Sequence, residues 1–281
     1  MDESEFEASE FRIAYNDWAA YMRQVLQYNA NVRSLIRTYL PPVAGVQRIL
    51  GRTPLKSHAR VVRVGRSVSA GKTELASGFS FTHAVTLMAV WGAFEAFVAD
   101  GCKAQLLLHP ELVETKPFES ARVPASLLFK DRRDRVAALY DHAVVRLRSD
   151  VRQGDKTPLI GIAKIEAQLK IVGLGNRGHD ISDELGQAIL HAQQSRHVWA
   201  HRAGKADEQF IKNCPMITTE VGKIIQITQE QNDLYCYALI VYGLLINNRF
   251  REAHDLAPEP FPWDRNVPFA DPYANLWGVS D

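Results

Sequence analysis

The sequence predicts an all-α protein, built as a bundle of four or five helices with an extra long helix before it. Two observations favour this fold class. Apolar residues recur at three- and four-residue steps over most of the chain, which is the period of one helix face. Capping residues, glycines and prolines fall between these stretches, where helices begin and end. The composition, 46% hydrophobic and 23% charged, is that of an ordinary globular protein.

A long helix is expected over residues 4–40, where aromatic and aliphatic residues recur with the helical period. The pair Pro41–Pro42 is expected to end it, because proline cannot donate the backbone hydrogen bond of a helix interior. Residues 44–77 are rich in Gly, Arg and Val, which predicts a loop or a small hairpin.

The helices of the bundle follow this segment, and each has its own start or stop signal. They are expected at 80–108, at 124–149, from Thr157–Pro158 to Gly173, from Asp180 or Ser182 to His201 with Gly204 closing it, and at 230–255. A short extended piece is expected at 223–228.

This pattern divides the chain into three parts. An N-terminal helix and basic segment take residues 1–78, and a helical domain takes residues 79–256. The tail, 257–281, holds five prolines and several aromatic residues, so an irregular segment that packs on a surface is expected.

The composition indicates a cytoplasmic protein with no membrane attachment. The apolar runs Tyr235–Ile246 and Ala84–Phe94 are too short to cross a bilayer of about 30 Å. The acidic N-terminus lacks the pattern of a secretory signal. The three cysteines contain no CxxC pair and are typical of packed thiols in a reducing compartment.

Charge is distributed unevenly along the chain. Residues 18–73 hold eight arginines, two lysines and no acid, a charge of +10, so the net charge of +1 leaves −9 for the remainder. Such asymmetry favours a surface that faces a polyanion, or a segment that docks on an acidic part of the chain or of a partner. The candidate RNA-binding residues in this segment are Arg48, Arg52, Arg60, Arg63 and Arg66.

Two glycine motifs resemble nucleotide-binding loops but do not fit them. The run from Gly65 to Thr73 separates its glycines by five residues, whereas the phosphate-binding loop requires four. The run Gly173–Gly178 fits GxGxxG, yet a helical pattern precedes it where a dinucleotide fold requires a strand. A helix end followed by a loop explains these glycines better.

Two charged residues stand on stripes that otherwise predict buried helix faces. Arg196 continues the stripe Leu185, Ile189, Ala192, and Glu95 stands between Trp91 and Val98 on another helix. A charge on such a face is costly unless it is paired or lines a cleft. The two residues therefore predict either an internal ion pair or two parts of one site.

The residues around Arg196 resemble a known signature. An arginine, a polar residue and a histidine four to six positions after the arginine, here Arg196, His197 and His201, are similar to the motif of the HEPN superfamily of helical domains. The resemblance covers roughly residues 80–255. It extends to flanking residues of the kinds that the family carries, namely Arg202, Gly204, Asp207, the segment from Gly222, and Glu95 in an aromatic-rich upstream helix.

The resemblance implies metal-independent RNA cleavage, often in toxin–antitoxin or anti-phage roles, by a homodimer and without a cofactor. Arg196 would hold the scissile phosphate, and His201 would act as acid or base near neutral pH. His197 would be a helper or a polar wall, and Glu95 would orient Arg196 or His201. Arg202 and Lys205 are further candidates for RNA contact. RNA is the expected substrate, and an antitoxin or another protein is a candidate partner.

Geometry leaves one question open. Five helical steps turn through about 500°, so Arg196 and His201 would point about 140° apart on a regular helix. The helix must break before His201, or the site must be shared across a dimer.

Two other functions compete with the ribonuclease. The spacing of His197 and His201 is also that of zinc ligands, with His191 or Asp207 as a third, but the glutamate of a metalloprotease is Val198 here. The main rival is a non-catalytic RNA-binding or protein-interaction module.

Overall fold

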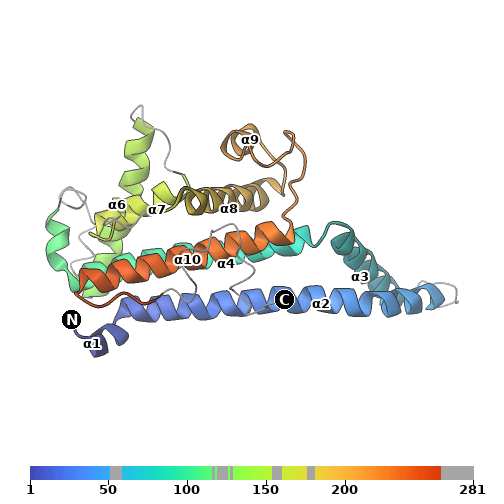
Figure 1. Ribbon diagram of the computed structural model, residues 1–281, viewed down its shortest axis with the longest axis horizontal. Helices are drawn as coiled ribbons and strands as arrows, with labels where there is room; N and C mark the ends of the chain where they lie inside the picture. The colour runs from blue at the N-terminus through green and yellow to red at the C-terminus, as the bar shows by residue number, and fades with distance from the viewer. Residues whose placement is uncertain are drawn as a thin grey trace. The chain divides into compact units, whose positions relative to one another are not determined.

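The chain is mostly helical in the part that the computed structural model describes (Figure 1). That part comprises residues 1–50, 59–115, 118, 126, 129–153, 160–175 and 181–260. Within it the only β-type pairing outside helices is an isolated bridge between Lys205 and Ile224. The all-α prediction is confirmed at this level.

The chain forms two compact units. Unit 1 comprises Met1–Ala20, Trp91–Gln194 and the chain from Tyr237 onward, and unit 2 comprises Tyr21–Val90 and Ser195–Cys236. Four long helices contribute residues to both units. The helices are α1 (Glu3–Glu7), α2 (Glu10–Leu50), α3 (Ala59–Ala76), α4 (Ser80–Leu108), the 3-10 helix η2 (Pro110–Glu114), α6 (Arg132–Gln153), α7 (Ile162–Ile171), α8 (Asp183–Arg202), α9 (Glu208–Asn213) and α10 (Gln229–Ala253).

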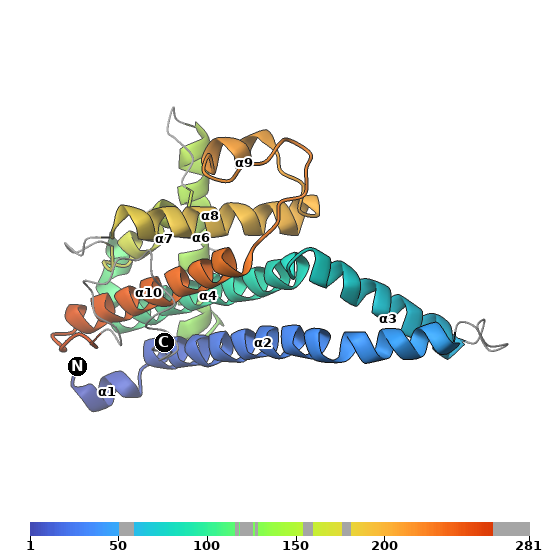
Figure 2. The same cartoon turned by 45° about the vertical axis from the view of Figure 1, so that its right-hand side comes forward.

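Helix α2 continues through Pro41–Pro42, so the expected stop there is wrong. The expected loop or hairpin at 44–77 is also wrong, because α2 runs to Leu50 and α3 occupies Ala59–Ala76. Packing within unit 2 offsets the lost backbone hydrogen bonds. The Leu40 side chain, next to the prolines, lies over Gly71 of α3, and both views show α3 returning along the last part of α2 (Figure 2).

The later helices agree with the sequence in type and in most of their ends. Gly173 follows α7 with a positive φ of 75°, and Ser182 accepts a hydrogen bond from the Leu185 amide at the start of α8. The glycines of the run 65–73 lie inside α3, where no phosphate loop exists. Thr157–Pro158, Asp180, Gly178 and residues 261–281 lie outside the described residues.

Helix α4 is the one described helix that is long and apolar enough to span a membrane. This assessment rests on length and composition alone, and core helices of water-soluble proteins share both properties. Half of the apolar stretch is buried inside the protein.

The core of unit 1 is built on aromatic rings from α2, α4 and α10. Phe11 stacks on Phe250 with ring centroids 3.8 Å apart, and Trp18 stacks on Phe97 at 5.0 Å. Gly243 of α10 lies directly against the Trp18 ring. The indole therefore occupies the space that a side chain at position 243 would need.

Substitution Gly243→Ala is expected to lower the free energy of unfolding by about 1–3 kcal/mol, the usual cost of overpacking a core. The Cβ of the introduced alanine would overlap the Trp18 ring. The free-energy cost of this overlap should exceed the gain from the higher helix propensity of alanine. The matched control is Gly92→Ala on α4, where a Cβ meets nothing within 4 Å and the same propensity gain should stabilise by about 0.5–1 kcal/mol. Urea unfolding of both variants gives their free energies of unfolding. Equal stabilisation by the two substitutions would contradict the close contact between Gly243 and Trp18.

Candidate active site

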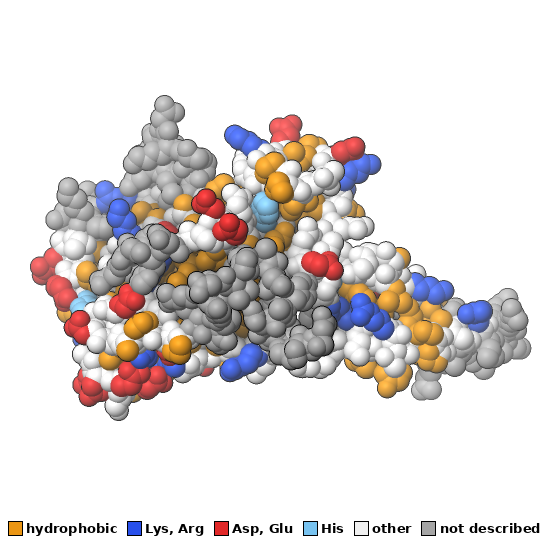
Figure 3. Space-filling model, viewed as in Figure 1, with side chains coloured by type: hydrophobic (Ala, Val, Ile, Leu, Met, Phe, Trp, Pro, Cys, Tyr) orange, Lys and Arg blue, Asp and Glu red, His pale blue; other side chains and the backbone are white. Residues whose placement is uncertain are grey.

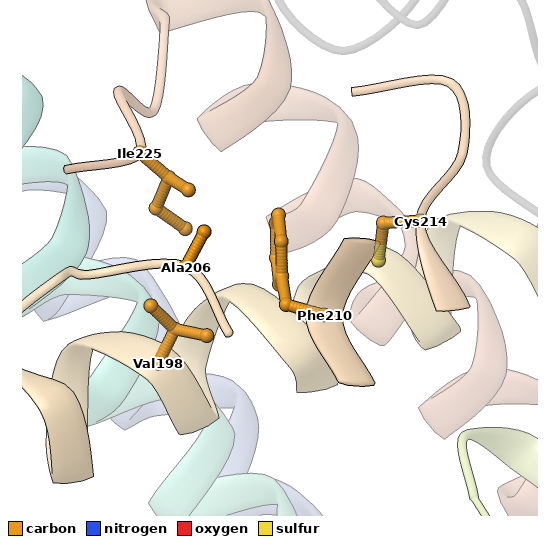
Figure 4. Packing of buried hydrophobic residues seen from close by; sticks show 5 residues of the cluster. All are labelled: Val198, Ala206, Phe210, Cys214 and Ile225. Carbon is orange, nitrogen blue, oxygen red and sulfur yellow. The ribbon is translucent and has the colours of Figure 1, made fainter. Parts of the chain in front are cut away.

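The last turns of α8 carry the predicted motif and are held by a small hydrophobic core in unit 2. Val198 points from α8 towards Phe210 of α9, with Ala206, Cys214 and Ile225 completing the cluster (Figure 4). Trp199 and Ile217 pack against it. These residues fix the segment 203–228 on the end of α8, so the backbone that carries the motif is rigidly supported.

A tight turn follows α8. Ala203 and Gly204 both have positive φ, 51° and 82°, and a Cβ at Gly204 would lie 3.1 Å from the Trp199 ring. Asp207 then caps α9 by accepting from the Phe210 amide at 2.8 Å, and its carboxylate pairs with Arg202 at 3.3 Å. The predicted flanking residues Arg202, Gly204 and Asp207 therefore have structural roles in closing one helix and starting the next.

Helix α8 does not break before His201, because it runs unbroken to Arg202. Of the two arrangements that the sequence left open, a break within the motif is therefore wrong. Arg196 and His201 point about 140° apart around one helix axis. His197 and His201, four residues apart, instead share a face, and their ring centroids lie 4.8 Å apart.

Both imidazoles of this pair are exposed, whereas Arg196 is half-buried. Partial burial lowers the pKa of His197, and the neighbouring His201, Arg196 and Arg202 lower it further, while Asp207 opposes them. His197 is therefore neutral at pH 7 and available as a proton acceptor.

Glu95 lies in unit 1 and forms an ion pair there with Lys164 of α7 (Nζ–Oε1 2.9 Å). It stands on the expected stripe between the buried residues Trp91 and Val98. Its predicted role in orienting Arg196 or His201, which belong to unit 2, stays a prediction.

Of the predicted RNA-binding arginines in the basic segment, the described ones lie on α2 and α3 of unit 2. Arg48 is exposed near the end of α2, and Arg63 and Arg66 are exposed on α3. Lys and Arg side chains lie beside exposed hydrophobic ones over α2 and α3 (Figure 3). Arg60 belongs to α3 with its side chain not described, and Arg52 lies outside the described residues. Lys205 is exposed in the turn after α8.

A buried histidine of α4, which was not identified from the sequence, is hydrogen-bonded to the end of the 203–228 segment. The His83 ring Nδ1 bonds the Ile227 carbonyl at 2.9 Å, and the Ser80 hydroxyl accepts from the Ile227 amide at the same distance. Burial lowers the His83 pKa, and the nearby Arg33 adds to this while Asp233 opposes it. His83 and Ser80 therefore hold the segment that supports the motif.

Stability is expected to fall as the pH decreases from 7 to 5. The unfolded chain binds a proton at His83 near pH 6.5, whereas the folded chain resists it, so protonation favours unfolding below that pH. One such group contributes at most about 1.4 kcal/mol per pH unit between its two pKa values. Urea unfolding at several pH values should give a smaller slope for His83→Gln. A slope equal to that of the wild type would contradict the buried neutral imidazole.

The described residues contain no cluster of metal ligands at the motif. Groups of three or more His, Cys, Asp or Glu placed to hold an ion are absent from the described residues. A cleft of about 580 Å³ in unit 1 is lined by Glu5, Glu10, His109, His254 and neighbouring apolar residues, none of them a predicted site residue.

Comparison with protein-family models, curated proteins and solved structures finds no significant match to this chain. The resemblance to the HEPN superfamily therefore rests on the motif and its flanks.

Proposed function

We propose that this protein is a metal-independent endoribonuclease in which Arg196 and His201 act on the scissile phosphate. The observation that carries the proposal is the arrangement at the end of α8. There an arginine and two exposed histidines occupy a helix end that a hydrophobic cluster holds in place. The HEPN-like order of these residues and the exposed arginines of α2 and α3 support it.

The reaction needs only groups that the chain and the RNA supply. A neutral imidazole accepts the proton of the 2′-hydroxyl, and the 2′-oxygen attacks phosphorus. The bond to the 5′-oxygen breaks, and a protonated imidazole gives that oxygen its proton. The products are a 2′,3′-cyclic phosphate and a 5′-hydroxyl. Arg196 stabilises the charge on the phosphate oxygens as the bond breaks.

The positions of these residues around α8 favour a site that two copies of the chain share. His197 and His201 share one face of α8, and on a regular helix Arg196 lies about 140° round the axis from His201. A phosphate beside the histidines of one copy would then meet Arg196 of a second copy in a homodimer. The site is expected to be complete only when both copies are present.

The biological setting follows from the same proposal. A cytoplasmic ribonuclease of this kind fits a toxin or anti-phage defence protein with an antitoxin or other protein partner. The rival is a non-catalytic module that binds RNA or protein. It is favoured by the structural roles of Arg202, Gly204 and Asp207, which explain part of the motif without chemistry.

Incubation of purified protein with an end-labelled structured RNA in EDTA separates these functions. The proposal predicts cleavage by the wild type. The variant Arg63→Ala/Arg66→Ala should bind RNA more weakly than the wild type. The number of phosphate contacts derived from the salt dependence of binding should fall by about one for each arginine. At saturating concentrations the variant should still cut the RNA. Binding without cleavage would instead support the non-catalytic module.

A further inference from the structure

Helix α2 carries an apolar stripe on the surface of unit 2 that the described residues of the unit leave largely exposed. Three of its side chains are more than half exposed, Tyr28 at 70%, Tyr39 at 57% and Leu35 at 55%. Large apolar side chains rarely line up on a surface without a partner. The stripe consists of Tyr21, Val25, Tyr28, Val32, Leu35, Tyr39 and Val43.

This stripe is separate from the face by which α2 packs in unit 2. The packing face carries Met22, which is buried, Asn29, which bonds Thr86 of α4, and Leu40, which lies over Gly71 of α3. On a helical projection these three residues are centred about 90° from the stripe. Among the described residues of unit 2, the three tyrosines, Leu35 and Val43 of the stripe therefore stay exposed, while Val25 and Val32 are half-buried.

The spacing of the stripe is that of a coiled-coil seam. From Tyr21 to Tyr39 its members alternate steps of four and three residues, which places Val25, Val32 and Tyr39 at a positions and the remainder at d positions. β-Branched residues at a favour pairing of two helices. With three tyrosines and a leucine, the stripe offers on the order of 500 Å² per copy. A pair of stripes then reaches the lower limit of about 1,000 Å² for a specific interface.

The uncharged residues beside the stripe favour a second copy of the chain as the partner that covers it. The positions that flank the stripe on its open side are the uncharged Gln24, Asn31 and Thr38. Two such stripes can therefore meet without like-charge repulsion. Arg23 and Arg37 project from the opposite side of α2, too far round the helix to pair with an acidic partner or a nucleic acid seated on the stripe.

We propose that the protein self-associates through α2, whose stripe pairs with the same stripe of a second copy. The seam runs from Tyr21 to Tyr39, and the arginines of both copies remain on the outside. This interface stands on the exposed face of α2 alone and does not depend on ribonuclease activity.

Sedimentation equilibrium of the full chain over a range of concentrations tests the proposal. The wild type is expected to dimerise. Tyr28→Glu/Leu35→Glu, which puts two charges in the seam, should raise the dissociation constant at least 100-fold. Both side chains are exposed, so helix content by circular dichroism should not change. The matched control is Ala30→Glu/Ser34→Glu, two exposed positions on another side of the same helix, which should dimerise like the wild type.

A cross-link then locates the contact. Val32 lies at the centre of the stripe and meets its own copy in either helix orientation, so Val32→Cys should form a disulfide-linked dimer on mild oxidation. The three native cysteines are buried and serve as the background in the wild type. A monomeric wild type, or a Tyr28→Glu/Leu35→Glu variant that still dimerises, would overturn the proposal.

Discussion

Mixing the inactive variants Arg196→Ala and His201→Ala is expected to restore about a quarter of the wild-type ribonuclease activity. Each variant alone should lose about 10²–10⁴-fold in rate, the usual effect of removing a proton-transfer group or a donor to a developing charge. The two residues lie about 140° apart around an unbroken α8, so the proposal brings Arg196 of one copy and His201 of another to one phosphate.

The expected fraction follows from two-fold symmetry. After exchange of subunits, half of the proposed dimers would contain one copy of each variant. Each mixed dimer has one site with both residues lost and one site with both intact. The control mixes Arg196→Ala with the double variant Arg196→Ala/His201→Ala, which leaves every site without its arginine. If the first mixture cuts RNA no faster than the control, both residues act within one copy and the shared site is wrong.

Replacement of Arg249 by Met is expected to lower the free energy of unfolding by about 3–5 kcal/mol, the cost of breaking a buried ion pair from one side. The Arg249 guanidinium is fully buried in unit 1 and pairs with Glu166 at 2.7 Å. The Tyr242 hydroxyl donates to the same carboxylate. Burial and the neighbouring carboxylate raise the pKa of Tyr242, so the tyrosine stays protonated and cannot replace the lost cation.

Urea unfolding of Arg249→Met beside Arg133→Met measures this effect. Arg133 pairs with Glu10 at the surface of the same unit, so its replacement should cost less than about 1 kcal/mol. Adding Glu166→Gln to Arg249→Met should recover part of the loss, because it removes the uncompensated charge. Equal losses for the two single variants would show that the buried pair does not stabilise unit 1.

The signal for this pair was present in the sequence. Tyr235, Leu239, Tyr242 and Ile246 form a stripe at steps of four and three residues, and Arg249 continues it. The same rule singled out Arg196 and Glu95, yet both of these are only half-buried, whereas Arg249 is fully buried. A charge on an apolar stripe thus predicts a partnered charge, but it does not distinguish a structural pair from a functional site.

Local sequence rules failed where packing between helices opposed them. Pro41–Pro42 should have ended α2, and the Gly- and Arg-rich stretch after them should not have been helical. The contact of Leu40 with Gly71 joins α2 to α3, which stabilises helix on both sides of the prolines. Such a contact lies about thirty residues away in the chain and leaves no local pattern.

The part of the site that could be predicted was its position at the end of α8. The end of this helix was predicted to within one residue, since α8 ends at Arg202 before Gly204. The sequence could not show whether the helix breaks between the arginine and the histidine of the motif, because no glycine or proline within the motif favours either arrangement. His83 was missed for a different reason. Its partner is the backbone carbonyl of Ile227, and a side chain that bonds a distant main-chain atom has no sequence signature.

The most direct test of the central claim is cleavage, in EDTA, of an oligoribonucleotide whose scissile position carries hydrogen in place of the 2′-hydroxyl. We expect the all-ribose strand to be cut with a 2′,3′-cyclic phosphate left on the upstream product, and the substituted strand to stay intact at that bond. Equal cleavage of both strands would contradict the claim, as would products bearing a 5′-phosphate or cleavage that requires a divalent metal.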